Sequence, residues 1–338
     1  MENWWFVLLA KSQWRSPAAL QILGITGFPG LSFAVMLANV SLASLLLRWR
    51  GIAAGTPPFR AAAAGLIVVA GCVGWGWLSL LDAPAERIRI AATTDMVDAD
   101  PAIGALGELA GFFVTDPERS HSIFDVNATL TRSTQDRRPD FVVWPENEFS
   151  DIDDPELIGR LGALASEVGR RAKINITSGE AKQGFAAGPH SFPVFEKPHA
   201  RVGIAVCWDV HRLWIMRELA RAGAELVLLP MDNDFEGTPW FPAFHASDAV
   251  FRAAEHRLAF GLGTVNGLSL VIDPYGRITA EGAINEPGVI VGKTFIASQR
   301  TLYTRFWDWF GWGLALASLA LFVAARRNAG RPTSPQSR

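Results

Sequence analysis

Cysteine is scarce in this sequence. Only two of the 338 residues are cysteine, Cys72 and Cys207, and they lie far apart. Two distant cysteines exclude a disulfide framework and do not have the spacing of a zinc site. The chain also lacks a strong net charge, because 31 basic residues nearly balance 33 acidic ones. Such a balance gives no reason to expect nucleic acid as a partner.

Charge is almost missing from three stretches, residues 30–47, 61–81 and 306–325. Each has about 18–21 residues, the length that crosses the hydrocarbon core of a bilayer. Tryptophans lie near their ends, as aromatic residues do at a membrane interface. The alternative is a hydrophobic core helix of a soluble protein. We predict transmembrane helices at about 30–47, 61–81 and 304–325, the first two within a membrane region of residues 1–82.

Arginine sets the expected orientation. Arg48 and Arg50 follow the first apolar stretch, and Arg326 and Arg327 follow the third. Because cytoplasmic loops are rich in Lys and Arg, these two arginine-bearing segments are expected in the cytoplasm, and the N-terminus and residues 83–303 outside it. The N-terminus has no basic region typical of a cleavable signal peptide. The polar tail 326–338 is expected to be disordered.

The region between the second and third apolar stretches alternates short apolar runs with amphipathic ones. This alternation predicts an α/β layered domain. The expected strands are residues 89–93, 140–144, 174–177, 202–206, 226–229, 258–264, 269–272 and 288–292, and the expected helices are 123–134, 155–171, 213–222 and 244–256.

Two of these strands end on residues that can do chemistry. Cys207 follows the apolar run 202–206, and Glu146 follows 140–144. A carboxylate at a strand end can take the proton of a thiol, and the thiolate is the actual nucleophile. Each residue also has a plainer interpretation. A free cysteine usually packs as a small hydrophobe, and most glutamates lie exposed in loops.

The runs Val-Val-Trp-Pro-Glu146 and Gly-Ile-Ala-Val-Cys207-Trp-Asp resemble the nitrilase (carbon–nitrogen hydrolase) superfamily. Other motifs are similar to the apolipoprotein N-acyltransferase family in particular: Gln13-Trp-Arg-Ser-Pro17, Phe251-Arg-Ala-Ala-Glu-His-Arg257, Asp273-Pro-Tyr-Gly-Arg277, and the run 301–311 before the last apolar stretch. These motifs cover nearly the whole chain in the family's order.

The resemblance implies an αββα sandwich flanked by transmembrane helices, two before it and one after. It also implies a Glu-Lys-Cys catalytic set without metal or cofactor. Cys207 would be the nucleophile and Glu146 the base. Lys182 is the best candidate for the lysine, with Lys197, in an expected hairpin turn, as the next.

The residues after Cys207 have supporting roles in this interpretation. The backbone N–H of Trp208 would help to hold the oxyanion. Asp209 would orient the loop or a lysine, or else cap the helix that follows. The histidines are scattered without metal-ligand spacing, so a surface or packing role is expected for each.

The implied reaction takes a fatty acyl chain from a phospholipid through a Cys207 thioester to the α-amine of a diacylglyceryl-cysteine lipoprotein. It would take place at the outer face of the bacterial cytoplasmic (inner) membrane, where a multi-pass chain holds the catalytic domain.

The sequence departs from the family in three ways. It has room for three membrane spans rather than about eight, which predicts a truncated gene product or a reduced homologue. The family's lysine-bearing segment is shortened, so Lys182 can also be a solvated loop lysine. Cys-Trp-Asp is closer to nitrilase-like amidases than to the acyltransferases. A membrane-tethered amidase and a non-catalytic homologue therefore remain as alternatives.

Overall fold

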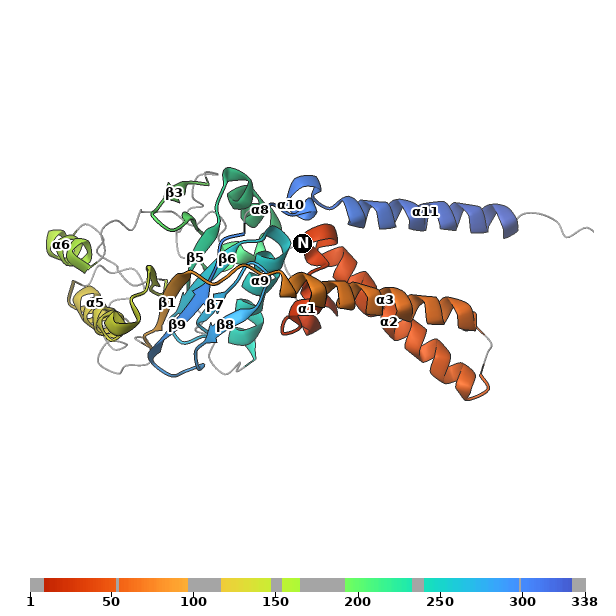
Figure 1. Cartoon of the computed structure of the whole chain (residues 1–338), viewed down its shortest axis with the longest axis horizontal. Coiled ribbons are helices and arrows are strands. Elements are labelled where there is room, and N and C mark those ends of the chain that lie inside the picture. The colour runs from red at the N-terminus through yellow and green to blue at the C-terminus, as the bar shows by residue number, and fades with distance from the viewer. Residues whose placement is uncertain are drawn as a thin grey trace, which may run out of the picture.

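Three long apolar helices project from one side of a mixed α/β domain (Figure 1). The computed structural model describes residues 9–52, 55–96, 117–146, 154–164, 192–232, 240–297 and 299–329. The predicted strand 174–177 and the tail beyond residue 329 lie outside these ranges, as does the second half of the predicted helix 155–171.

In the described residues, nine strands form one sheet at the centre of the domain. Its main path runs β2-β1-β6-β5-β4-β3. The first five of these strands are parallel, and β3 is antiparallel to β4. Strands β7 and β8 continue antiparallel from β6, and β9 is antiparallel to β1. The strands are β1 (Ile88–Thr94), β2 (Phe141–Val143), β3 (Val194–Glu196), β4 (Arg201–Ile204), β5 (Leu226–Met231), β6 (Ala259–Thr264), β7 (Leu270–Ile272), β8 (Ile278–Glu281) and β9 (Gly288–Thr294).

Helices cover both sides of this sheet. Helices α8 (Leu213–Ala222) and α9 (Phe241–His256) follow β4 and β5, while α5 (Pro117–Arg132) packs against β1 and against α6 (Pro155–Leu164). Parallel strands buried under helices read as continuous apolar runs, which is why the sequence reveals them. The mixed α/β domain predicted from the sequence, with two apolar helices before it and one after, is confirmed.

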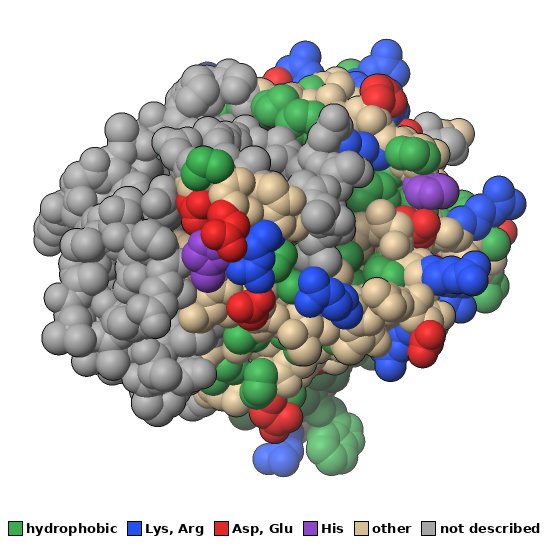
Figure 2. Space-filling view, turned by 90° about the vertical axis from the view of Figure 1, so that its left-hand side faces the viewer, with side chains coloured by type: hydrophobic (Ala, Val, Ile, Leu, Met, Phe, Trp, Pro, Cys, Tyr) green, Lys and Arg blue, Asp and Glu red, His purple; other side chains and the backbone are tan. Residues whose placement is uncertain are grey.

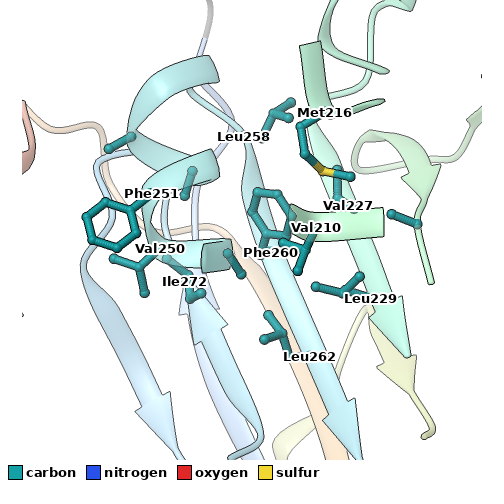
Figure 3. Close-up of a cluster of buried hydrophobic side chains, with 14 of the residues drawn as sticks. Val210, Met216, Val227, Leu229, Val250, Phe251, Leu258, Phe260, Leu262 and Ile272 are labelled. Carbon is teal, nitrogen blue, oxygen red and sulfur yellow. The ribbon is translucent and has the colours of Figure 1, made fainter. Parts of the chain in front are cut away.

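The main hydrophobic core lies between the sheet and helices α8 and α9 (Figure 3). Phe260 and Leu262 of β6 meet Val250 of α9 and Met216 of α8, and all four are fully buried. The N-terminal segment belongs to the same core, because Leu23 and other residues before position 32 pack into it. The first membrane-type helix is therefore fastened to the domain by apolar contacts at its beginning.

Within the part of the chain that the structure describes, three helices are long and apolar enough to cross a membrane. They are α2 (Leu23–Trp49), α3 (Phe59–Leu81) and α11 (Trp309–Ala329). Helix α2 begins earlier than the predicted span at 30–47. Helix α11 begins later than predicted, because Trp307 has a left-handed backbone (φ 61°) that separates it from the short helix α10 (Leu302–Phe306). The basic ends of α2 and α11 both point away from the domain (Figure 1).

A glycine makes the junction between α2 and α10 possible. Gly27 lies at a kink inside α2 with φ 65°, and a Cβ there would lie 2.2 Å from the ring of Tyr303. A left-handed backbone costs other residues energy, and this contact leaves no space for a side chain. Trp309 adds a hydrogen bond of 2.8 Å from its ring Nε1 to the carbonyl of Ile25.

The α/β domain and the three apolar helices have different surfaces. On the described part of the domain face turned away from the apolar helices, acidic and basic side chains are interspersed (Figure 2). The apolar helices instead expose large hydrophobic side chains, such as Trp312 and Leu321 on α11 and Ile67 on α3, each at least 70% exposed. Apolar surface of this extent is typical of contact with a membrane.

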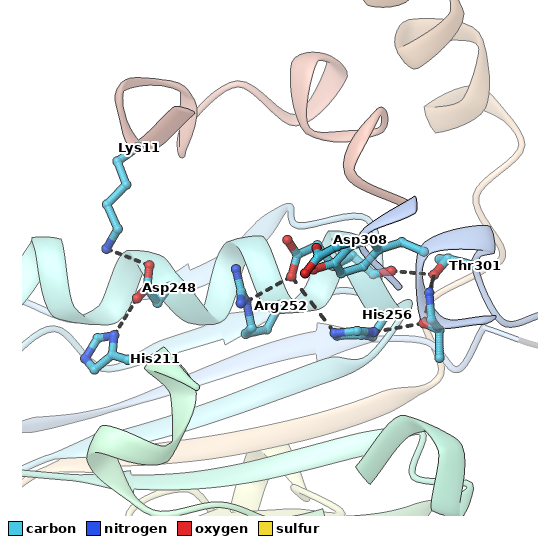
Figure 4. Close-up of polar contacts among 10 residues, drawn as sticks. Lys11, His211, Asp248, Arg252, His256, Thr301 and Asp308 are labelled. Atoms are coloured by element: carbon cyan, nitrogen blue, oxygen red, sulfur yellow. Dashed lines mark hydrogen bonds and ion pairs between the residues drawn. The ribbon is translucent and has the colours of Figure 1, made fainter. Parts of the chain in front are cut away.

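A buried ion pair lies where α9 meets α2 and α10 (Figure 4). Arg252 Nε is 3.1 Å from Glu255 Oε2, and both side chains are almost fully buried. Burial raises the pKa of Glu255 to about 7, although Arg252 opposes the rise. The carboxyl group is therefore largely protonated in the folded chain at pH 5 to 6, where it would be ionised in the unfolded chain.

We expect this carboxyl group to make stability fall as pH rises. The pKa of this carboxyl group is near 4.5 in the unfolded chain and about 7 in the folded chain. Between these pH values, the folded chain holds a proton that the unfolded chain has lost. Stability is then lost progressively up to pH 7, by about 3 kcal/mol in total. Glu255→Gln should flatten this dependence, measured as the difference between thermal midpoints at pH 5 and pH 8 in detergent. Glu281→Gln, at the surface, is the matched control. An equally steep pH dependence in Glu255→Gln and the parent would contradict the assignment.

Candidate active site

The candidate catalytic residues follow parallel strands of the sheet. Glu146 comes three residues after β2, and Cys207 three residues after β4. Because the carboxyl ends of parallel strands lie at one edge, both residues reach the same side of the domain. The strand end that carries Glu146 is held by Trp144, which packs edge-on against Phe124 of α5 and donates a 3.0 Å hydrogen bond to Thr131.

Cys207 begins the 3-10 helix η5 (Cys207–His211) and is 7% exposed. Its φ of 45° is left-handed, which is uncommon for a residue with a side chain and is typical of strained turns at functional sites. Asp209 stabilises this turn. Its buried carboxylate accepts a 3.1 Å hydrogen bond from the backbone N–H of Val206. The helix α8 that follows has Arg212 as its N-cap, so Asp209 does not cap it.

The end of β5 brings the two candidate residues together. The backbone N–H of Glu146 donates to the carbonyl of Met231 at 3.5 Å. The thiol of Cys207 lies 3.7 Å from the carbonyl of the next residue, Asp232. Glu146 Oε2 is buried. The Cys207 thiol and the backbone of Glu146 therefore border the same short stretch of chain, Met231 and Asp232.

The lysine of the predicted set is not placed by the structure. Lys182 lies outside the described residues. Lys197 lies in the hairpin turn between β3 and β4, where its N–H donates to the carbonyl of Ala200 at 3.1 Å. The hairpin turn expected around Lys197 is present. Lys182 remains a prediction.

Two histidines lie beside Cys207, a position that the sequence did not predict for them. His245 Nε2 is 3.9 Å from the Cys207 sulfur, and His211 Nε2 is 3.4 Å from His245 Nδ1. Both side chains are at most 1% exposed, so neither has the surface role considered for it. The indole of Trp208 packs edge-on against both rings, with centroids 4.6 and 5.5 Å away.

The short separations along the chain could have suggested this cluster. His211 follows Cys207 by one turn of a helix, and His245 and Asp248 are three residues apart on α9. Residues at that spacing share one helix face. Among the described residues, no group of three or more His, Cys, Asp or Glu side chains is arranged to hold a metal ion.

Comparison with known proteins gives three results. Residues 147–298 match the carbon-nitrogen hydrolase family model. The apolipoprotein N-acyltransferase of Geobacter metallireducens is 25% identical over 94% of this chain and 70% of its own length. That of Pseudomonas syringae pv. tomato is 30% identical over 41% of this chain and 26% of its own length.

Among solved structures, a mutant of the Nesterenkonia AN1 amidase from the nitrilase superfamily superimposes with a TM-score of 0.48 and 18% identity. The superposition covers 63% of this chain and 92% of the amidase. Residues 147–298 are thus similar to the carbon-nitrogen hydrolase family, and the chain is similar along most of its length to an apolipoprotein N-acyltransferase.

Proposed function

We propose that this chain is a membrane-bound acyltransferase that works through a thioester. The Cys207 thiolate attacks the ester carbonyl of a phospholipid, the C–O bond breaks, and a lysophospholipid leaves. The α-amine of a diacylglyceryl-cysteine lipoprotein then attacks the thioester, the C–S bond breaks, and an amide forms as the thiol is regenerated. The observation that supports this proposal is that the Cys207 thiol and the backbone of Glu146 both contact the chain at the end of β5.

Glu146 is the general base in this scheme. It accepts a proton as a nucleophile is activated, a role worth about 10²–10⁴ in rate. Lys182 and the backbone N–H of Trp208 stabilise the oxyanion of the tetrahedral intermediate. Asp209 supports the turn that presents the thiol, through its hydrogen bond to Val206.

The apolar helices support lipid substrates in particular. Both substrates are anchored in a bilayer, so a domain held at the membrane surface meets them at high local concentration. The basic ends of α2 and α11 point away from the domain. With those ends in the cytoplasm, the domain lies at the outer face of the inner membrane.

The test follows one labelled acyl chain through both steps. The full chain is incubated in vesicles of phospholipid with a radiolabelled acyl chain. We expect label on the protein that neutral hydroxylamine releases, because hydroxylamine cleaves thioesters. Addition of a diacylglyceryl-cysteine peptide should move the label to the peptide in hydroxylamine-resistant form. The same peptide with an acetylated amine is the matched control and should leave the label on the protein.

Two outcomes would count against the proposal. Absence of label on the wild-type chain would exclude the first step. Release of ammonia from small amides without any lipid label would instead support the amidase alternative, which has the same thiol and carboxylate but a water acceptor.

A further inference from the structure

A buried row of polar side chains leads away from the Cys207 thiol. It runs from the sulfur to His245, then to His211, Asp248 and Lys11. The Cys207 sulfur lies 3.9 Å from His245 Nε2, and His245 Nδ1 lies 3.4 Å from His211 Nε2. His211 Nδ1 makes a short hydrogen bond with Asp248 Oδ2, and Lys11 Nζ lies 2.6 Å from Asp248 Oδ1. No side chain in the row is more than 7% exposed. Figure 4 shows the outer half, with Lys11 reaching from the N-terminal segment to α9.

The hydrogen-bonding capacity of each group sets the direction of the row. An ionised carboxylate only accepts, so His211 Nδ1 carries a hydrogen that it donates to Asp248. A neutral His211 then offers the lone pair of Nε2, and His245 Nδ1 donates to it. The other nitrogen of His245, Nε2, is left with a lone pair on the side of the Cys207 sulfur.

The charges around the row agree with these protonation states. Burial lowers the pKa of His211 despite the neighbouring Asp248, which favours the neutral ring. Burial also opposes ionisation of Asp248, but Lys11 and His211 outweigh it and hold the pKa of Asp248 below its usual range. Burial lowers the pKa of Lys11, against the attraction of Asp248. Arg252, the next cation on α9, also lowers the pKa of both Lys11 and His211.

We propose that His245 is the resting proton acceptor of the Cys207 thiol, and that His211, Asp248 and Lys11 are positioning residues that fix its tautomer. The inference rests on the proposed role of Cys207 as nucleophile. His245 then holds the thiol proton before the lipid substrate binds. Glu146 remains available to exchange protons with the substrates.

The step conserves protons and electrons. The S–H bond of Cys207 breaks, its electron pair stays on sulfur, and the proton bonds to His245 Nε2. The resulting imidazolium still donates from Nδ1 to His211, and the Asp248 carboxylate stabilises its charge through that ring. When the tetrahedral intermediate collapses, His245 returns the proton to the leaving oxygen and becomes neutral again.

Alkylation by iodoacetamide measures the thiolate without requiring turnover. The full chain carries Cys72→Ala, and hydroxylamine treatment in detergent free of phospholipid removes any bound acyl group. We expect His245→Gln to slow alkylation of Cys207 at pH 7 about tenfold or more, and to move the pH midpoint of alkylation upward. His199→Gln is the matched control, because His199 lies exposed in the β3–β4 hairpin and should leave the profile unchanged.

Asp248→Asn provides a second test with nearly the same side-chain shape. Lys11 can bond only to the amide oxygen, so it should turn the amide NH₂ toward His211. His211 and then His245 must adopt the opposite tautomers, and His245 would point an N–H at the sulfur. We expect alkylation to fall as in His245→Gln. A merely structural role of Asp248 would lower the thermal midpoint without moving the pH profile.

The outcomes separate this inference from the proposed function. Wild-type alkylation profiles in folded His245→Gln and Asp248→Asn chains would overturn the relay, even if phospholipid labelling of Cys207 succeeds. Altered profiles in both variants would support it, even if no acyl label forms and the proposed function fails.

Discussion

Cys207→Ala is expected to abolish the hydroxylamine-sensitive acyl label and all acyl transfer. Without the sulfur no thioester can form, and loss of a covalent nucleophile costs about 10⁶ in rate in enzymes of this type. The substitution keeps the Cβ, so the left-handed backbone at this position is as strained as before. The measurement is the acyl label per mole of protein from radiolabelled phospholipid, together with the thermal midpoint in the same detergent.

The second cysteine provides the control for this experiment. Cys72 lies half-buried in the apolar helix α3, and it is far in the sequence from Glu146 and Cys207. Cys72→Ala should keep both the label and the transfer. Full labelling in Cys207→Ala, or equal losses in the two variants, would contradict the role of Cys207 as nucleophile.

The sequence predicts the thiol and carboxylate through a simple regularity. Buried parallel strands are apolar along their whole length, so the first polar residue after each one marks an edge of the sheet. Glu146 and Cys207 are such residues, and both border the end of β5. The apolar spans are equally visible, because length and lack of charge suffice to recognise them.

The histidine row could not be predicted in the same way. Its members come from η5, from α9 and from the N-terminal 3-10 helix η2 (Leu9–Gln13), and only the tertiary fold brings these elements together. Lys11 in particular reaches Asp248 across 237 positions of sequence. Hydrophobic periodicity within a segment carries no information on which segment lies opposite it.

The first residues of the apolar helices are set by local backbone geometry. An apolar pattern continues through Gly27 and Trp307, but the backbone at both is left-handed and interrupts the helix. Tyr303 packs against Gly27, so the two interruptions meet where α2 and α10 lie against the domain. Packing between distant segments, rather than composition, sets these boundaries.

Arg252→Met is expected to destabilise the folded chain by about 3–5 kcal/mol at pH 8, because it leaves the Glu255 carboxylate buried without its cation. The arginine also lies 5.0 Å from the ring of Phe28 at the beginning of α2, so its loss should loosen the docking of that helix. Glu255 can relieve part of the cost by staying protonated. The loss should therefore be smaller at pH 5 than at pH 8.

Thermal and denaturant unfolding of the full chain in detergent measure this effect. Arg221→Met is the matched control, because Arg221 pairs with Glu218 at the surface of α8 and should cost less than about 1 kcal/mol. The double variant with Arg252→Met and Glu255→Gln removes both charges, so it should recover much of the lost stability and show little pH dependence. A double variant as unstable at pH 8 as Arg252→Met alone would mean that the arginine acts through its packing on Phe28, and that its charge is incidental to the docking of α2.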